Sequence, residues 1–206
     1  KYADFVSQSY HPVKAFTTGE GGSIISNNKK IIEKIKLMRN HSMIKNSKKS
    51  PWQYKIFSPG QNYRITDIQC ALGISQLKKL DNFVSERRKI AKYYINELKN
   101  FSKFILPNEE KHCKHSFHLF PLQIKFNKLK INKKELFKKF LRKGIKLQVH
   151  YIPIHLQPYY KENFYINRKE LNNAEEFYKN EVSIPIFPGI KKNQLLKVVN
   201  ELKLIR

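Results

Sequence analysis

The sequence is poor in cysteine, in acidic residues and in long apolar runs, and these shortages exclude several classes of protein. Only two of its 206 residues are cysteine, Cys70 and Cys113, too few for the disulfide framework of a small secreted domain. No apolar run approaches the ~20 residues that cross a bilayer as a helix. The chain also opens without the basic and apolar stretches of a signal peptide. Two free thiols suit a reducing compartment, so we expect a cytoplasmic protein with no membrane partner.

The shortage of acid leaves a formal charge of +25, because 41 Lys and Arg residues face only 16 Asp and Glu. A basic surface can bind nucleic acid by releasing counterions from phosphate. Here the charge is carried by 34 lysines spread along the whole chain, with no arginine-rich stripe and no RRM, KH or zinc-finger pattern. We therefore expect no nucleic-acid partner, and keep a basic nucleic-acid-binding module as the alternative of another class. A positive field would also attract a substrate that bears a diphosphate.

Apolar spacing predicts a mixture of helices and strands. Hydrophobic residues make up 40% of the chain and aromatic residues 13%, enough for a folded core. The first part predicts strands at 5–10 and 23–26, helices at 28–39, 66–77 and about 81–98, and a long loop at 40–61. The second part predicts strands at 117–126, 145–151 and 182–186, helices at 133–143, 172–180 and 192–203, and a proline-rich loop at 152–159.

The predicted elements divide into two domains near the helix at 81–98, and we place the boundary after residue 85. Residues 86–206 then form a small α+β unit. Residues 1–85 hold only two short strands, too little sheet to bury the apolar faces of their helices. A larger sheet must come from residues outside this chain or from another chain, so we expect the chain to be a fragment.

One lysine stands in an unusual setting. In the segment 9–22 (SYHPVKAFTTGEGG), a strand ends, Pro12 stiffens a turn, Lys14 follows, and a glycine-rich run lets backbone approach a ligand closely. A lysine placed so could form a Schiff base if its surroundings favour the free amine. It could equally be one more surface lysine, and spacing alone favours that interpretation. The spacing of the glycines excludes a Walker A loop.

This segment closely resembles the Schiff-base lysine motif of the DegT/StrS family, the nucleotide-sugar aminotransferases that depend on pyridoxal phosphate (PLP). Arg39 to His41 resembles the family's Arg-x-His, and the segment 60–73 (GQNYRITDIQCALG) resembles its Gly-x-Asn-Tyr-Arg segment. The segments 148–160 (QVHYIPIHLQPYY) and 183–189 resemble a branch that aminates C4 of a UDP-4-keto-6-deoxy-N-acetylhexosamine on the route to pseudaminic acid. The resemblance extends over essentially all 206 residues.

The resemblance implies an α/β fold, the type I aminotransferase fold of PLP-dependent transferases. Residues 1–85 would be the C-terminal part of the large PLP-binding domain, and residues 86–206 the small C-terminal α+β domain. The implied reaction is PLP-dependent transamination of the UDP-linked keto sugar with glutamate as amino donor, in a homodimer with shared active sites. The alternatives are another nucleotide-linked keto sugar, or a relative that binds PLP or sugar without catalysis.

The resemblance also implies roles for individual residues. Lys14 would bind PLP covalently and carry the proton, and Ser9 would place a hydroxyl on the PLP phosphate. Asn62 would reach the phosphate of PLP in the neighbouring subunit, although by itself it is typical of a turn after Gly60. Weaker candidates for the nucleotide-sugar site are Arg64, His150 and Tyr151. Arg64 could meet a diphosphate or form a surface ion pair, and a lone histidine such as His150 is more often structural.

Two further clusters have the residue types of a metal site and of a catalytic carboxylate pair, but we expect neither. His112, Cys113, His115 and His118 could hold zinc by residue type. We predict that the last two run into a strand, whose alternation would put them on opposite faces, and the family uses no metal. We therefore expect no metal. Glu175 and Glu176 could suggest paired catalytic carboxylates, but we predict that they lie on a solvated helix face.

Overall fold

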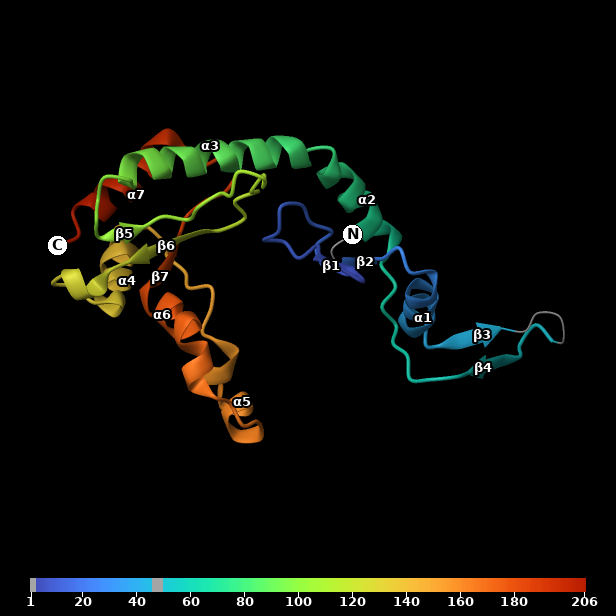
Figure 1. The fold of residues 1–206 in the computed structure, drawn as a ribbon. Helices are drawn as coiled ribbons and strands as arrows, with labels where there is room; N and C mark the ends of the chain where they lie inside the picture. Colours follow the sequence, from blue (N-terminus) through green and yellow to red (C-terminus); the bar gives the residue numbers. More distant parts are fainter. Residues whose placement is uncertain (1–2, 46–49) are drawn as a thin grey trace. The chain divides into compact units, whose positions relative to one another are not determined.

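The computed structural model describes residues 3–45 and 50–206 and divides the chain into two compact units, Lys1–Leu80 and Asp81–Arg206 (Figure 1). The division lies at the start of a long helix, whereas the sequence placed it after residue 85. The apolar face of that helix belongs to the second unit, because Ile90, Tyr94 and Leu98 are part of the hydrophobic cluster there. No helix in the described ranges is long and apolar enough to cross a membrane.

The first unit begins with an antiparallel hairpin of β1 (Val6–Ser9) and β2 (Gly22–Ile25). Val6 pairs with Ile25 at one end of the ladder and Ser9 with Gly22 at the other. Gly22 is required there, because a Cβ at this position would lie 2.6 Å from the carbonyl oxygen of Gln8. The two strands agree with the prediction, and they carry between them the loop that contains Lys14.

Two capped helices follow in this unit. In α1 (Lys29–Arg39), Asn28 is the N-cap and its side chain accepts hydrogen bonds from the amides of Lys30 and Ile31. In α2 (Asp67–Leu77), Thr66 and Gln69 form a capping box. Such caps satisfy amides that have no partner within the helix. They explain why the sequence located both helix starts correctly.

The segment 40–61, predicted as a long loop, contains a second hairpin instead. β3 (Met43–Lys45) pairs antiparallel with β4 (Tyr54–Ile56), and residues 46–49 between them lie outside the described residues. The strands are three residues each, too short for alternation to stand out among polar and turn-forming neighbours. The prediction of an irregular loop was therefore wrong for these residues.

The second unit is an α+β arrangement around a three-stranded antiparallel sheet. Its strand order is β5 (Phe104–Ile105), β6 (Phe120–Ile124) and β7 (Glu181–Ile184). The longer helices are α3 (Leu80–Leu98), α4 (Lys133–Arg142), α6 (Asn172–Asn180) and α7 (Lys192–Lys203). Shorter elements are the 3-10 turns Phe126–Lys128, Ile154–Leu156 and Arg168–Leu171 and the helix α5 (Pro158–Asn163).

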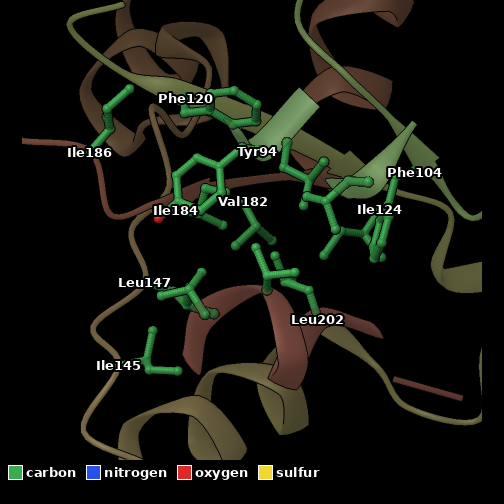
Figure 2. Packing of buried hydrophobic residues seen from close by; sticks show 14 of the residues in the cluster. Tyr94, Phe104, Phe120, Ile124, Ile145, Leu147, Val182, Ile184, Ile186 and Leu202 are labelled. Carbon is green, nitrogen blue, oxygen red and sulfur yellow. The ribbon is translucent and has the colours of Figure 1, made fainter. Parts of the chain in front are cut away.

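The hydrophobic core of the described residues lies in this second unit (Figure 2). The side chains of Tyr94, Phe120, Val182 and Leu202 are fully buried in it, and they come from one helix, two strands and a second helix. The Tyr94 hydroxyl donates to the carbonyl of Pro185 over 2.8 Å, which satisfies the one polar atom of that side chain. All four residues of β7 are buried, and buried residues alternate with half-buried ones in β6, which explains why these two strands could be predicted; the two-residue β5 was not predicted.

The strand predicted at 145–151 is not formed as a strand. Only Gln148 pairs with Ser183 of β7, through two backbone hydrogen bonds of 3.1 and 2.8 Å. Two residues later the ladder stops, because the amide of His150 donates to the carboxylate of Glu181 instead of a backbone carbonyl. The apolar alternation of Ile145 and Leu147, both buried, explains the misreading.

Candidate functional site

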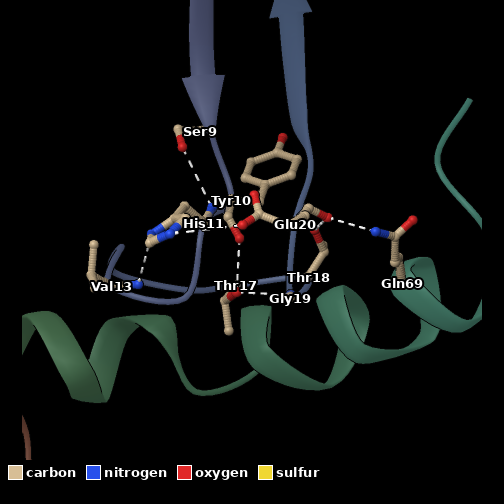
Figure 3. A network of polar contacts seen from close by, with 9 residues as sticks. All are labelled: Ser9, Tyr10, His11, Val13, Thr17, Thr18, Gly19, Glu20 and Gln69. Atoms are coloured by element: carbon tan, nitrogen blue, oxygen red, sulfur yellow. Dashed lines mark hydrogen bonds and ion pairs between the residues drawn. The ribbon is translucent and has the colours of Figure 1, made fainter. Parts of the chain in front are cut away.

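Lys14 lies in the loop between β1 and β2. Hydrogen bonds close the base of this loop, and Figure 3 shows the residues that make them. The amide of Tyr10 donates to the carbonyl of Gly21 over 2.9 Å, so the ladder of β1 and β2 continues one pair beyond the strands. The Tyr10 carbonyl in turn accepts from the Thr17 hydroxyl at 2.7 Å and the Thr18 amide at 3.1 Å. These bonds join the two ends of the loop, so the residues between Tyr10 and Thr17 form a short closed loop.

Within this closed loop, the Lys14 amide donates to the carbonyl of His11 over 2.9 Å, which forms a tight turn around Pro12. His11 Nε2 lies 3.7 Å from a carboxylate oxygen of Glu20, on the returning side of the loop. The ring centroids of Tyr10 and Phe16 are 4.7 Å apart, a contact across the loop. The loop is therefore held by its own side chains, as a defined support for one lysine.

The same loop rests on helix α2. Gln69 Nε2 donates to the carbonyl of Glu20 over 2.9 Å, a contact that Figure 3 shows next to the loop network. Thr18 is almost fully buried, and its methyl lies above Gly73, where a Cβ would be only 2.8 Å from Thr18 Cγ2. A helix residue without a side chain is therefore what lets the loop and α2 approach so closely.

The lysine itself is half-buried, and within the described residues its amine has neither a hydrogen-bond nor an ion-pair partner. An amine that no carboxylate occupies is available to a ligand. Ser9 ends β1 on the approach to the loop, is exposed, and its Oγ accepts only a long 3.4 Å bond from the His11 amide. The structure therefore offers a lysine amine and a serine hydroxyl from one strand–loop junction.

Asn62 and Arg64 come together around a third residue, Asn40. Asn62 forms an isolated antiparallel bridge with Asn40, and Arg64 Nη1 donates to Asn40 Oδ1 over 2.5 Å. Both predicted residues are exposed, and neither makes a contact with Lys14 in the described structure. Arg64 donates to an amide oxygen, and among the described residues it has no acidic partner for the surface ion pair that was the alternative. Asn40 was part of a quoted motif but was not predicted as a site residue.

The turn before Asn62 depends on Gly60. A Cβ there would collide with the backbone of His41 and Ser42, which both have positive φ. Ser42 is fully buried and donates to the carbonyl of Pro59 over 3.0 Å. This packing of two chain segments presents Asn62 and Arg64 on the surface.

His150 and Tyr151 lie in the second unit. His150 is half-buried, its amide donates to Glu181, and its Nδ1 lies 2.8 Å from the hydroxyl of Ser183. Tyr151 is 71% exposed and meets the His150 ring edge-on. Glu181 and Ser183 were missed by the sequence reading, because they are more than thirty positions from His150 and nothing in the local pattern pairs them.

Glu175 was predicted to lie on a solvated helix face, but in the structure it contacts two other side chains. Its carboxylate accepts from Arg168 Nε and Nη2 at 2.9 and 2.6 Å and faces Nε2 of the buried His155 at 3.1 Å. The hydrogen bonds from Arg168, followed by that from His155, lower the pKa of Glu175 to about 2. The group fastens the segment that follows Tyr151 to α6. It also borders an open surface pocket of about 850 Å³, to which none of the predicted site residues contributes.

The predicted geometry of the histidine cluster was wrong in one respect. His115 and His118 both precede β6, so strand alternation does not separate them. The His115 carbonyl accepts a hydrogen bond from Arg88, and its ring Nδ1 accepts from the Phe117 amide. Among the described residues, no three His, Cys, Asp or Glu side chains are grouped in a way that could hold a metal ion.

Comparison with known proteins defines first the class and then the family. The solved structure of PseC from Helicobacter pylori, an aminotransferase of pseudaminic acid biosynthesis, matches with a TM-score of 0.88 and 31% identity, over 98% of this chain and 53% of that one. A putative sugar aminotransferase from Streptococcus pneumoniae, solved in a PMP-form, matches with a TM-score of 0.85 and 24% identity, over 98% of this chain and 52% of that one. The fold is thus that of the PLP-dependent sugar aminotransferases.

The model of the DegT/DnrJ/EryC1/StrS aminotransferase family matches residues 1–203, and the chain belongs to this family. The UDP-4-amino-4,6-dideoxy-N-acetyl-beta-L-altrosamine transaminase of Campylobacter jejuni is 42% identical over 90% of this chain and 48% of its own length. An uncharacterised protein of Methanocaldococcus jannaschii is 39% identical over 98% of this chain and 54% of its own length. The chain thus spans about half the length of the relatives it matches.

The cofactor of this family is pyridoxal phosphate, and the residues of the loop fit it. An aldehyde needs an amine without a competing partner, which Lys14 supplies. A phosphate needs donors on exposed backbone or side chains, and Ser9 Oγ is exposed at the same junction. The hydrogen bonds of Tyr10 and the support from α2 keep both in a defined place.

Proposed function

We propose that the protein transfers an amino group from glutamate to C4 of a UDP-linked 4-keto-6-deoxy-N-acetylhexosamine, on the route to pseudaminic acid or a related surface sugar. The observation that carries the proposal is the amine of Lys14, which has no partner among the described residues and lies in a loop closed by Tyr10 and supported by α2. Support for the sugar comes from the Campylobacter relative, whose name specifies that transamination, at 42% identity.

Lys14 would do two things in this reaction. Its Nζ would bind the cofactor covalently, and, once released by the donor, the same amine would move a proton between the Cα of the amino acid and C4′ of the cofactor. When bound, pyridoxal phosphate supplies the electron-accepting ring that lets that proton leave. The turn from His11 to Lys14 would keep the amine within reach of both atoms, and positioning of this kind contributes much of a rate enhancement.

The phosphate of the cofactor would be held by Ser9 and by Asn62. Ser9 Oγ can donate without adding charge, and its present bond to the His11 amide uses only its acceptor side. We propose that Asn62 acts across a homodimer, on the phosphate bound by the other subunit. Its exposure and its anchorage by the bridge to Asn40 suit a residue presented to a partner.

The nucleotide-sugar would meet Arg64, His150 and Tyr151. Arg64 uses Nη1 on Asn40, which leaves the rest of its planar fork for a diphosphate. Tyr151 offers an exposed ring and hydroxyl. The net charge of +25 would draw an anionic substrate towards the protein. We propose further that the first unit belongs to the large PLP-binding domain, the second is the small domain, and the protein acts in the cytoplasm.

The test is an amination assay with the intact protein, PLP, glutamate and the UDP-4-keto sugar, followed by mass spectrometry of the product. We expect an amino sugar from the natural protein and from Lys34→Arg, a matched change at an exposed lysine of α1. Lys14→Arg should give none, because guanidinium neither binds the aldehyde as an amine does nor returns the proton. Substantial turnover by Lys14→Arg would refute the assignment.

The same assay separates the proposal from its alternatives. Amination of a different nucleotide-linked keto sugar, with the UDP-4-keto sugar left unchanged, would retain the chemistry of Lys14 and reject the substrate. Binding of PLP without turnover on any keto sugar would favour a non-catalytic relative. The spore coat polysaccharide biosynthesis protein SpsC of Bacillus subtilis, 29% identical to the chain, is a reason to include other sugars.

A further inference from the structure

Three side chains of the second unit form a continuous hydrogen-bonded chain. Glu181 is fully buried, and its Oε1 accepts from the hydroxyl of Ser183 over 2.6 Å. The same hydroxyl lies 2.8 Å from Nδ1 of His150. The second carboxylate oxygen, Oε2, accepts from the backbone amide of His150 over 3.0 Å. The imidazole is therefore linked to one buried carboxylate both through its backbone and through Ser183.

The position of each proton in this chain follows from counting donors. A carboxylate that accepts at both oxygens has no proton of its own to give. Ser183 has one hydroxyl proton, and the bond to Glu181 uses it. The bond between Ser183 and His150 must then take its proton from the ring, so Nδ1 carries the hydrogen. In a neutral imidazole this leaves Nε2 as an acceptor.

The charge on Glu181 has a compensating neighbour. Desolvation lowers the pKa of Lys133, and Glu181 acts against this shift, so the ammonium and the carboxylate sense each other. Lys133 Nζ donates to the carbonyl of Tyr178 over 2.6 Å, which holds it in place. Two hydrogen-bond donors and a nearby ammonium are the partners that a buried carboxylate needs.

The other ring nitrogen is left free. Nε2 of His150 has no hydrogen-bond partner among the described residues, and the residue is only half-buried. The neighbouring ring of Tyr151 meets the imidazole edge-on and is itself exposed. An acceptor with a fixed tautomer that no described residue occupies is what a ligand with a donor group needs.

We propose that Glu181 and Ser183 are positioning residues that hold His150 in the Nδ1–H tautomer, so that its Nε2 accepts a hydrogen bond from an amide N–H of the nucleotide-sugar. The identity of that ligand rests on the proposed function; the tautomer does not. Specificity follows from the polarity of the bond. A group that can only accept, placed opposite Nε2, would face a lone pair and lose affinity.

The tautomer can be read directly from the intact protein labelled with ¹⁵N-histidine. Two-bond and three-bond proton–nitrogen correlations distinguish a protonated Nδ1 from a protonated Nε2, and His150→Gln assigns the signals. We expect Nδ1–H for His150 in the natural protein at neutral pH. Nε2–H in the natural protein would overturn the proposal without any variant and without reference to transamination.

Glu181→Gln offers a sharper test, because the amide keeps the shape and reverses the chain. Its oxygen must face the His150 amide, so its NH₂ must donate to Ser183. The Ser183 hydroxyl then donates to Nδ1, and the ring proton moves to Nε2. Ser183→Thr is the matched control, since it retains the hydroxyl and should retain Nδ1–H. An unchanged tautomer in a folded Glu181→Gln variant would contradict the proposed origin.

Ligand binding is measured separately, with UDP-N-acetylglucosamine as probe and calorimetry as readout. The reversed ring presents a donor where an acceptor is needed, so Glu181→Gln should weaken binding about tenfold, the usual cost of one lost hydrogen bond. Ser183→Thr should bind as the natural protein does. A reversed tautomer with unchanged affinity would reject the ligand contact. Failure of the amination assay would reject the proposed reaction and leave the tautomer result standing.

Discussion

Replacement of Gly73 by alanine tests whether the loop that carries Lys14 packs against α2 as closely as the structure shows. The new Cβ would lie 2.8 Å from Thr18 Cγ2, and no other atom is within 4 Å of it outside the helix's own backbone. Thr18 cannot turn away freely, because its hydroxyl donates to the carbonyl of Glu20 over 2.6 Å. The overlap is thus confined to one methyl group on a fixed side chain.

Two opposing effects set the magnitude. Overpacking of a tight contact costs about 1–3 kcal/mol, whereas alanine gains about 1 kcal/mol over glycine inside a helix. We expect Gly73→Ala to lower the free energy of unfolding by about 1 kcal/mol, because an overpacking cost of about 2 kcal/mol outweighs the helix gain of about 1 kcal/mol. It should also weaken retention of PLP, because the displaced residue belongs to the loop that carries Lys14.

Thr18→Ser provides the matched partner, since it removes Cγ2 and keeps the hydroxyl. Alone it should cost about 1 kcal/mol for one buried methyl. Combined with Gly73→Ala it removes the overlap, so the double variant should be no less stable than Thr18→Ser and should retain PLP. Urea unfolding and the visible absorbance of bound cofactor measure both effects. If the unfolding free energies lost in the two single variants add up in the double variant, within about 0.5 kcal/mol, the close contact is refuted.

Three further predictions concern other parts of the chain. Asn62→Asp should weaken PLP binding, because a negative charge would stand near the phosphate, and unchanged affinity in a fluorescence titration would count against that placement. The pKa of Glu175 is lowered to about 2 mainly by Arg168, so the contribution of this carboxylate to stability is complete above about pH 4.5 and is lost as the pH falls towards 2. Glu175→Gln should therefore flatten the plot of unfolding free energy against pH between these values. An unaltered plot would contradict the lowered pKa. Tyr94→Phe should cost about 1 kcal/mol in denaturant unfolding, because the half-buried Pro185 carbonyl loses its 2.8 Å donor, and a neutral change would mean that the bond contributes nothing.

Much of the fold could be predicted because its signals are local. The start of α2 follows from a capping box of Thr66 and Gln69, three residues apart, and α3 follows from apolar residues at helical spacing. The hairpin of β3 and β4 could not be predicted, because strands of three residues leave no clear period. The segment 145–151 has the period of a strand, but Glu181 takes the amide of His150 and ends the pairing.

The candidate site also combines residues that the sequence could predict with contacts that it could not. Lys14 was predicted from a contiguous motif, and the structure adds what holds the loop around it: the hydrogen bonds at Tyr10 and the contact of Thr18 with Gly73. The partners of His150 were not found, because the chain brings them together from thirty-odd positions away. Hydrogen bonds over such distances depend on the tertiary fold, and a single sequence holds no pattern that reveals them.

The central claim is that Lys14 is the attachment point of the cofactor. Reduction of the protein with borohydride in the presence of PLP, followed by peptide mass mapping, tests it most directly, because the reagent fixes the cofactor wherever it is bound. The account predicts a stable adduct on Lys14 in preference to the other lysines among the 34 in the chain. Adducts scattered over many lysines, or concentrated on a different one, would contradict it.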